Sequence, residues 1–253
     1  MTWYEHWSRL LLVIGLRYFI IAGIAFGICY KILRKRIGYR KIQLRFPQNA
    51  DYRREIVYSC STIIIFSLVA VAFLFTPLRT ITRLYQHPAQ YGLAWYIAAF
   101  PLMFMVHDAW FYWTHRLMHY PPVFRIFHMV HHRSTNPSPW AAFAFHPTEA
   151  FVEAGIFPVL LIIMPLTGVH FVVFFLMMMV YNVYGHLGWE LYPKSFSRHW
   201  LGRWINTSVN HNQHHQFFKG NYGLYFLWWD RWMGTIREDY ESGYEAVQGR
   251  DDR

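Results

Sequence analysis

The sequence predicts an all-α integral membrane protein with three spanning helices, a short helical hairpin and a cytoplasmic, histidine-rich helical cap. Composition is the first reason, because apolar residues make up 55% of the 253 residues and charged residues only 15%. Soluble domains contain about 45–50% and about 25% of these classes. The second reason is the distribution of histidine, since 13 of the 15 histidines lie between His107 and His215. The high hydrophobicity also excludes a disordered chain.

Three apolar runs are long enough to cross a bilayer, which takes about 20 residues. They cover residues 10–30, 56–75 and 92–113. The first contains one charged side chain, Arg17, which we expect to reach toward the near end of the span. A fourth run, residues 154–184, would be about 46 Å long as one helix, more than the apolar core of a bilayer. Residues 165–168 (PLTG) break this run, which predicts a helical hairpin that returns to the side it came from.

Basic residues are concentrated between the first two spans. Residues 31–54 contain nine lysines and arginines and a single aspartate, Asp51, whereas the loop 76–91 has only Arg79 and Arg83. Loops rich in lysine and arginine stay in the cytoplasm, so the third span also ends there. We therefore expect a multi-pass protein with its histidine groups on the cytoplasmic side. Because the charge follows the spans, we expect no nucleic-acid partner.

Eight histidines form three groups with the spacing of helix neighbours. One H-x-x-x-H and two H-x-x-H-H patterns contain His115 and His119, then His128, His131 and His132, then His211, His214 and His215. Residues three and four apart share a helix face, so each group can direct its imidazoles at one point. Clustered imidazoles must be held neutral, and a bound metal does this. Eight nitrogen ligands exceed the need of one ion and indicate two metal ions, with Fe, Zn, Cu and Ni all open.

Three strings carry a resemblance to a known family. They are DAWFYWTHRLMH at residues 108–119, FHPTE at residues 145–149 and HNQHHQFFKGNYGLYFLWWDRWMGT at residues 211–235. Together they resemble the fatty acid hydroxylase/sterol desaturase superfamily of membrane di-iron oxygenases, and the third string is most similar to lathosterol-oxidase-type sterol desaturases. The similarity covers about residues 95–237. It implies an O₂-dependent oxidoreductase with two iron ions that hydroxylates or desaturates a lipid, either sterol-like or fatty acyl.

The resemblance also implies roles for individual residues. The metal ligands would be His115, His119, His128, His131, His132, His186, His211, His214 and His215. Glu190 stands where some hydroxylases of the superfamily have a further histidine, so it is either a ligand or a carboxylate that orients one. Asp108 precedes His115 by two helical turns, and we expect it to orient that imidazole. Asp230 is expected either to support the third histidine group or to pair with Arg231.

Partners follow from what the motifs contain and lack. The substrate is expected to be a lipid that enters from the bilayer. The sequence has no glycine-rich phosphate loop and no His-Pro-Gly-Gly haem motif, so electrons are expected from a separate ferredoxin or cytochrome b5-type donor. The alternative is a membrane metal-binding or transport protein. Transporters place ion sites near the bilayer midplane between repeated halves, whereas these histidines follow the span ends and no repeat is seen.

The expected organisation has three parts. Residues 1–92 form an N-terminal membrane anchor with two spans, residues 93–237 the catalytic region and residues 238–253 a polar C-terminal tail. His146 precedes Pro147 and is expected to start a helix. Four histidines without helical partners are expected at the interface or surface, namely His6, His87, His170 and His199.

Overall fold

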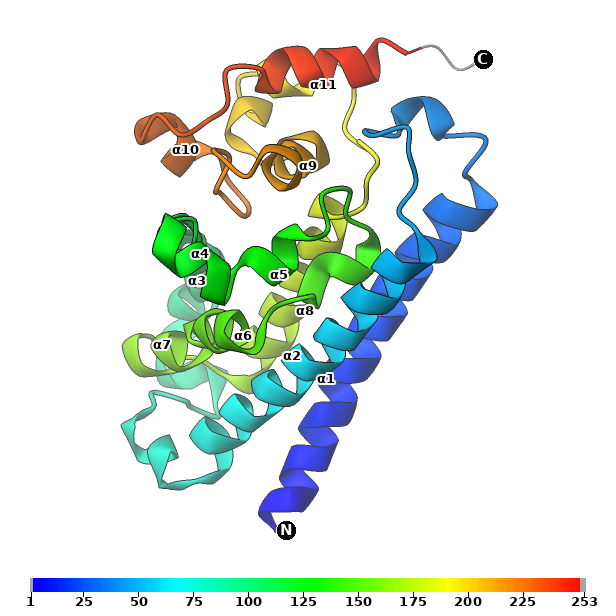
Figure 1. The fold of residues 1–253 in the computed structure, drawn as a ribbon. Helices are drawn as coiled ribbons and strands as arrows, with labels where there is room; N and C mark the ends of the chain where they lie inside the picture. The colour runs from blue at the N-terminus through cyan, green and yellow to red at the C-terminus, as the bar shows by residue number, and fades with distance from the viewer. Residues whose placement is uncertain (1, 251–253) are drawn as a thin grey trace.

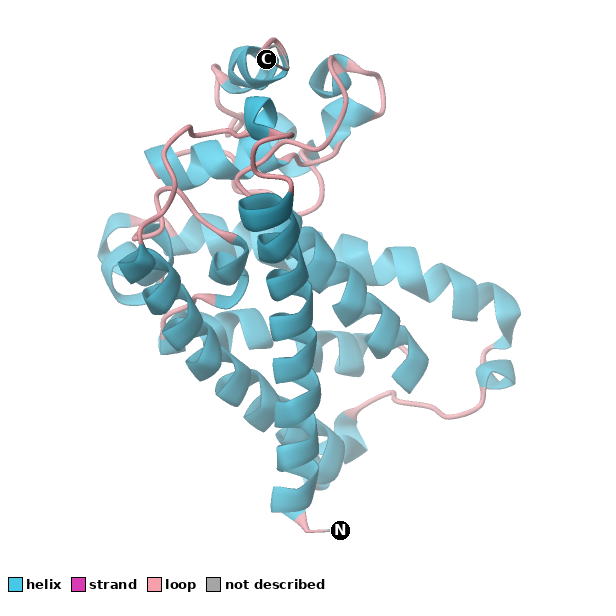
Figure 2. Ribbon diagram, turned by 90° about the vertical axis from the view of Figure 1, so that its right-hand side faces the viewer, coloured by secondary structure: helices cyan, strands magenta, loops and turns pink. Residues whose placement is uncertain are grey.

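A computed structural model describes residues 2–250 of the chain. Within these residues every regular element is helical, and strand-like pairing is limited to isolated bridges such as that between Lys41 and Trp189. Figure 1 shows long helices in the lower part of the molecule and short ones above them, and Figure 2 shows that loops and turns gather at the upper end. The all-α class is therefore confirmed for the described residues.

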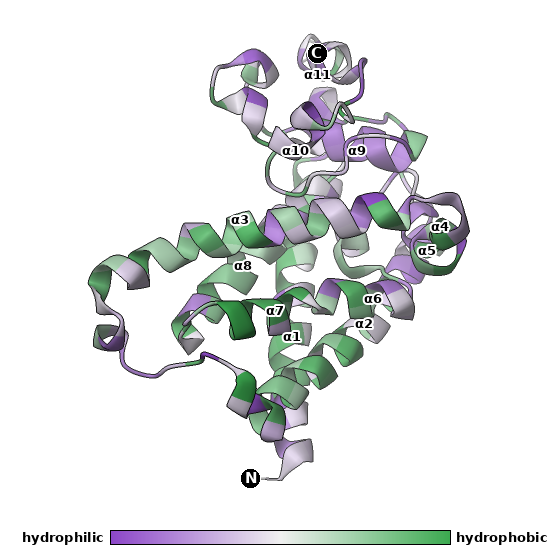
Figure 3. Cartoon of the chain, turned by 90° about the vertical axis from the view of Figure 1, so that its left-hand side faces the viewer, coloured by the Kyte–Doolittle hydropathy of each residue, from purple (hydrophilic) through white to green (hydrophobic). Residues whose placement is uncertain are grey.

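Four helices are long and apolar enough to cross a membrane. They are α1 (Trp3–Phe26) with its π-helical extension η1 (Gly27–Ile32), α2 (Asn49–Phe75), α3 (Gly92–Met118) and α8 (Gly168–Gly185). Figure 3 shows hydrophobic colours along most of these helices. Large apolar side chains such as Leu12, Ile20 and Ile24 on α1 are exposed, as expected for residues that face lipid chains.

The fourth apolar run breaks where the sequence predicts. The short helix α7 (Ile156–Ile163) ends before Pro165, and α8 begins after Thr167. Proline cannot continue the hydrogen bonding of a helix, and the Thr167 hydroxyl caps α8 by accepting from the His170 amide. The two helices on either side of the break differ in length, because α7 has 8 residues whereas α8 has 18. The longer arm is the fourth candidate span.

The first two long helices share a core with later parts of the chain. Tyr18 on α1 is fully buried, and its hydroxyl donates to the carbonyl of Trp140 at 2.8 Å. The same core contains Ile63 of α2 and Met179 of α8. Residues 2–92 therefore pack directly on the remainder of the molecule.

Short helices above the long ones form the cap. They are α4 (Pro121–Phe127), α5 (Met129–His132), α9 (Ser208–Phe217), α10 (Trp228–Trp232) and α11 (Tyr240–Gln248). The short helix α6 (Pro147–Ala154) lies lower, beside α2 (Figure 3). The 3₁₀ turns are η2 (Gly38–Arg40), η3 (Pro77–Ile81), η4 (Pro88–Gln90), η5 (Pro139–Phe143), η6 (Phe196–Arg198) and η7 (Gly202–Trp204). Figure 3 shows hydrophilic colour on α9, which carries the third histidine group.

The C-terminal tail is more than a polar extension. Tyr240 and Tyr244 on α11 are fully buried and share a small core with Val209 of α9 and Leu227. Residues four apart face the same side of a helix, so α11 has an apolar face despite its polar composition. Within the region expected to be a polar tail, α11 therefore packs on the cap through this face.

The basic loop between α1 and α2 lies against the cap. The amide of Gln43 donates to the Asn212 side chain on α9 at 2.8 Å, and the backbone N–H of Glu190 donates to the carbonyl of Arg40 at 3.1 Å. The Arg250 guanidinium donates to the carbonyl of Lys41. These contacts place the loop and the C-terminal region at one end of the molecule (Figure 1).

Candidate metal centre

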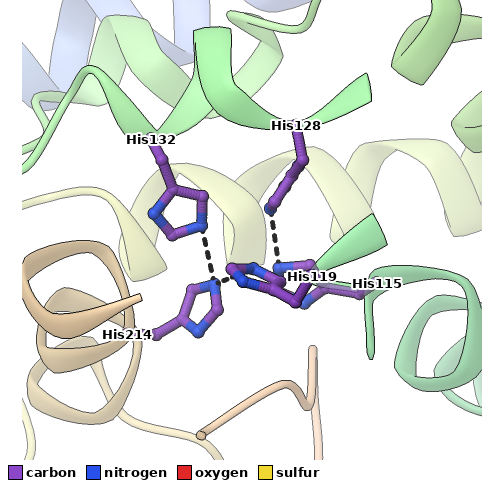
Figure 4. A group of neighbouring side chains, drawn as sticks. All are labelled: His115, His119, His128, His132 and His214. Carbon is purple, nitrogen blue, oxygen red and sulfur yellow. Dashed lines mark hydrogen bonds between the residues drawn. The ribbon is translucent and has the colours of Figure 1, made fainter. Parts of the chain in front are cut away.

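Nine histidines converge at the junction of the long helices and the cap. The five-histidine group contains His115, His119, His128, His132 and His214, and the four-histidine group contains His131, His186, His211 and His215. In each group one nitrogen per imidazole lies within 4.8 Å of all the others. The five-histidine group comes from α3 and the residue after it, from α5 and the residue before it, and from α9. Figure 4 shows that its rings point toward one another.

Helix geometry divides the two H-x-x-H-H patterns between the groups. Successive residues of an α-helix point about 100° apart, whereas residues four apart share a face. His128 and His132 therefore join the five-histidine group, while the neighbouring His131 faces the four-histidine group. On α9 the assignment is reversed, because His211 and His215 face the four-histidine group and His214 the other. Each pattern thus serves both groups.

Facing nitrogens are as close as ligands of one ion. The Nε2 atoms of His186, His211 and His215 lie 3.0–3.2 Å from one another. In the five-histidine group the Nε2 atoms of His115 and His128 are 2.9 Å apart. Two nitrogens bound at right angles to one metal ion, each about 2.1 Å from it, are about 3.0 Å apart.

Backbone carbonyls orient three of the rings. The Nδ1 atoms of His115, His186 and His214 donate to the carbonyls of Tyr222, Asn182 and Gly220 at 2.9, 2.8 and 2.7 Å. A carbonyl oxygen only accepts, so Nδ1 carries the proton and Nε2 of each neutral ring directs a lone pair into its group. Lone pairs that face one another repel, and a cation between them removes this repulsion. The donor set therefore fits two metal ions, one in each group.

Burial keeps the imidazoles in their ligating form. Removal from water, and after it the charges of neighbouring imidazoles, hold the pKa values of six rings well below 6.5. These rings are His128, His131, His132, His211, His214 and His215. Protons therefore do not compete with a metal ion for these nitrogens near neutral pH.

Glu149 is a contact that the sequence analysis missed. Its Oε1 lies 2.6 Å from Nδ1 of His128, and its side chain is 1% exposed. Metal-binding histidines commonly direct their second nitrogen at such a carboxylate. The signal was present in the FHPTE string, where Glu149 lies three residues after His146. His146 itself caps α6, as expected of a helix-start residue.

Asp230 acts through the segment that holds His115. Its carboxylate accepts from the backbone N–H groups of Tyr222 at 2.9 Å and Gly223 at 2.8 Å, and from the Thr235 hydroxyl at 2.7 Å. The Tyr222 carbonyl, placed in this way, receives the His115 ring. The alternative pairing with Arg231 is wrong, because that guanidinium pairs with Glu241 at 3.4 Å.

Asp108 contacts a different partner from the one expected. Its carboxylate accepts from the backbone N–H groups of Tyr225 at 2.8 Å and Phe226 at 3.2 Å, and from the indole of Trp228 at 2.7 Å. His115 is held by the Tyr222 carbonyl instead. Asp108 and His115 lie two turns apart on α3 but bond to different residues of the segment 222–228. Asp108 thus anchors the loop that follows α9.

Glu190 is fully buried and belongs to neither histidine group within residues 2–250. Its carboxylate accepts from the Tyr184 hydroxyl at 2.6 Å, from the Tyr192 amide at 3.0 Å and from the Val209 amide at 3.1 Å. Val209 lies in the first turn of α9. Glu190 therefore ties the segment after α8 to the start of the helix that carries three of the histidines.

His170 corrects another expectation. It is fully buried, where an interfacial or surface position was expected. Its Nδ1 accepts from the Thr167 amide at 3.0 Å, and its Nε2 lies 2.9 Å from the carbonyl of Tyr96. The ring thereby closes the start of α8 against α3.

A cavity of about 420 Å³ lies on the membrane side of the histidines, among α1, α2, α3, α7 and α8. Its lining is mostly apolar. Phe111 and Phe145 line it, and their rings contact those of His115 at 4.8 Å and His131 at 5.1 Å between centroids. The cavity is thus one layer of side chains away from both groups.

Arg17 lines the same cavity. Its guanidinium carbon lies 5.3 Å from the centre of the Phe175 ring on α8. The helical segment runs from Trp3 to Ile32, so Arg17 is at its middle, about 20 Å from either end.

Comparison with known proteins identifies one matching family and several similar relatives. Residues 100–235 match the family described as fatty acid hydroxylase. The chain is 30% identical over 234 residues to the Delta(7)-sterol 5(6)-desaturase ERG3B of Gibberella zeae, covering 91% of this chain and 69% of that protein. It is 29% identical to the lathosterol oxidase of Homo sapiens over 198 residues, covering 77% of this chain and 64% of that protein. No solved structure matches significantly.

Proposed function

The chain belongs to the fatty acid hydroxylase family, and from this premise we propose that its two histidine groups hold a di-iron centre that uses O₂ to hydroxylate or desaturate a sterol-type lipid. The family is one of membrane histidine-box enzymes with lipid substrates, and its relatives here include sterol 5(6)-desaturases and lathosterol oxidases. Sterol as the substrate of this chain is a proposal by similarity to them.

One observation carries the proposal, namely two adjacent groups of facing imidazole nitrogens beside an apolar cavity. One iron ion would be held by His115, His119, His128, His132 and His214, and the other by His131, His186, His211 and His215. Bound iron would supply the redox chemistry by which O₂ attacks an unactivated C–H bond. Histidine ligands suit iron, and protein geometry rather than affinity selects the metal.

The chain itself supplies orientation and a dry environment. The carbonyls of Tyr222, Asn182 and Gly220 fix the ring orientation of three histidines, and Glu149 fixes a fourth. The apolar lining of the cavity would hold a lipid and exclude bulk water from the reacting carbon. Phe111 and Phe145 would form the wall against which the reacting part of the lipid lies.

The electrons for this reaction would have to come from outside the two histidine groups. The sequence has no recognisable haem or nucleotide-binding motif. We therefore propose a separate donor of the ferredoxin or cytochrome b5 type. The basic residues of the first loop, apart from the buried Lys41, offer an acidic donor a complementary surface at the cap end of the molecule.

We also propose a topology and a division of the chain. The basic loop, and the cap that it contacts, would lie in the cytoplasm. Helices α1, α2 and α3 would span the bilayer, while α7 and α8 would form a hairpin that enters and returns on the same side. Residues 1–92 would act as the anchor, residues 93–237 as the catalytic region and residues 238–253 as the tail.

Reconstitution tests the proposed function. Purified protein loaded with iron is supplied with a ferredoxin or cytochrome b5 reducing system, O₂ and lathosterol, and the lipids are analysed by mass spectrometry. A product two hydrogens lighter, or one oxygen heavier, is expected only when donor and O₂ are both present. Metal that binds and exchanges freely without O₂ consumption would instead favour a metal-transport function.

A further inference from the structure

The cavity contains a buried carboxylate without a protein partner. Glu153 lies on α6, one turn after Glu149, and is 8% exposed. It lines the cavity, and within residues 2–250 no hydrogen bond or ion pair engages its carboxyl group. Glu149 on the same helix is bonded to His128. An unpaired carboxyl group in an apolar site is costly, so a ligand with a hydrogen-bond donor would satisfy it.

A second polar group faces the same cavity. His107 on α3 is 3% exposed and lines the cavity, with Nδ1 2.9 Å from the hydroxyl of Tyr225. When the Tyr225 hydroxyl donates to Nδ1, the neutral ring carries its proton on Nε2. No partner for Nε2 occurs in the described part of the chain. Burial, and after it the charges of Asp108 and Glu153, raise the pKa of the Tyr225 phenol, which keeps its hydroxyl protonated near neutral pH.

The two residues present one acceptor and one donor in an otherwise apolar cavity, which is the complement of a single hydroxyl group. We propose that Glu153 and His107 bind the hydroxyl group of the lipid substrate and thereby determine which carbon faces the metal centre. This inference rests on the proposed function. It assigns to these residues the choice of substrate and of reacting position.

The position of Glu153 narrows the substrate. One helical turn, about 6 Å, separates it from Glu149, whose carboxylate contacts His128 of the five-histidine group. The bound hydroxyl would therefore lie near the metal centre, and the reacting carbon within a few bonds of it. A ring lipid such as a sterol meets this condition, because its 3-hydroxyl carbon is two bonds from C5. An acyl chain oxidised at mid-chain does not.

Arg17 lines the same cavity from α1, where its guanidinium lies over the Phe175 ring, and within residues 2–250 no ion pair joins it to Glu153. The cavity volume of about 420 Å³ is within the usual range of small-molecule sites. A sterol held at Glu153 would extend its ring system and tail toward α1 and Arg17.

Equilibrium binding to the purified, iron-loaded full chain tests the assignment. The probes are lathosterol and its 3-deoxy and 3-O-methyl analogues. The wild type is expected to bind lathosterol about tenfold more tightly than 3-deoxylathosterol, or more, since a site built to pair with a hydroxyl rejects its absence. In Glu153→Leu the preference for lathosterol should fall sharply, because lathosterol loses the acceptor for its hydroxyl while the deoxy analogue loses nothing, and only the His107 donor remains. Glu153→Gln retains an acceptor oxygen and should keep part of the preference.

Phe151→Leu is the matched control on the same helix, since Phe151 is exposed on α6 and does not line the cavity. It should keep the full preference. Iron content and thermal unfolding are measured on each variant, and the comparison of probes on the wild type needs no variant at all. Equal binding of all three probes by the wild type, absence of sterol binding, or an unchanged preference in Glu153→Leu would overturn the assignment.

The same samples separate this inference from the proposed function. Hydroxyl preference that depends on Glu153, with no product formed in the presence of donor and O₂, would leave the binding site in place and count against oxidation. Product formation without any hydroxyl preference would support oxidation and overturn the assignment of Glu153 and His107 as the hydroxyl-binding residues.

Discussion

His131 and His132 are adjacent in the chain, yet their rings face different groups of nitrogens. Their separation follows from helix geometry alone, because neighbouring residues of a helix point about 100° apart. At the residue scale, therefore, the function of a histidine depends on its phase along the helix. Three predictions belong to this scale.

His131→Ala should lower bound iron by about half and abolish turnover, because only the four-histidine group loses a ligand. His132→Ala should do the same through the five-histidine group. Metal analysis and sterol turnover on both variants provide the test. His199→Ala is the control, since His199 is exposed and outside both groups, and it should keep full iron and activity. Full iron in both ligand variants would refute the assignment.

Glu149→Gln should reduce turnover about 10–100-fold, the usual effect of removing the carboxylate partner of a metal-binding histidine. Iron content should fall less than turnover, because the His128 nitrogen itself remains. The measurement is kcat per bound iron. His146→Ala serves for comparison, as it removes only the cap of the same helix and should cost about 1 kcal/mol of stability with turnover per iron retained.

Gly220→Ala should lower both iron content and Tm. Gly220 has φ +80°, and an added Cβ would lie 2.7 Å from the carbonyl oxygen of Thr235. Its own carbonyl receives the ring of His214, so a shift of this turn displaces a ligand. Gly234→Ala is the matched control, because it has φ +64° with no atom within 4 Å of the added Cβ. Both substitutions should lower the stability of the fold by about 1–2 kcal/mol, because alanine disfavours the left-handed backbone conformation. Only Gly220→Ala should also lose iron.

At the scale of elements, three carboxylates place segments and do not touch the ligand rings. Asp230 builds the turn that carries the Tyr222 and Gly220 carbonyls, Asp108 anchors the loop after it, and Glu190 joins the segment after α8 to α9. Each accepts three hydrogen bonds from buried donors, which gives the loops of the cap the precision that regular helices obtain from their own backbone bonds.

Glu190→Gln should destabilise the fold by about 1–3 kcal/mol, because an amide cannot accept all three hydrogen bonds that the carboxylate does. Iron should remain mostly bound while turnover falls, since the change reaches the histidines only through the start of α9. Chemical unfolding and metal analysis are measured together. Loss of iron at unchanged stability would show that Glu190 is a ligand after all.

At the scale of the whole molecule, the first loop contacts α9 and Arg250. These contacts predict that the loop, the cap and the C-terminal region lie on the same side of the membrane. Single cysteines at Arg36 and Ser242, both exposed, should react equally with a membrane-impermeant maleimide in inside-out vesicles. A cysteine at Thr80, in the loop between α2 and α3, should react only in right-side-out vesicles. Each single cysteine is introduced into a variant in which the exposed native Cys60 has been replaced. Labelling of Arg36 and Ser242 on opposite sides would contradict the fold.

By itself, the sequence determined the class of the molecule and the three histidine patterns that are proposed to bind metal. Spans follow from runs of apolar residues, and the histidine patterns follow from spacing within single helices, so both are local properties. The break before α8 was also local, because Pro165 and Thr167 act on their own neighbours.

Only the tertiary structure decided how these parts meet. It divided nine histidines into two groups, gave Asp108 a partner 117 residues away, and built α11 into the cap. It also brought Glu153 and His107 to one cavity, although they lie on different helices. Contacts of this kind depend on the packing of helices far apart in the chain. Spacing along one helix states which residues share a face, and packing alone determines what that face meets.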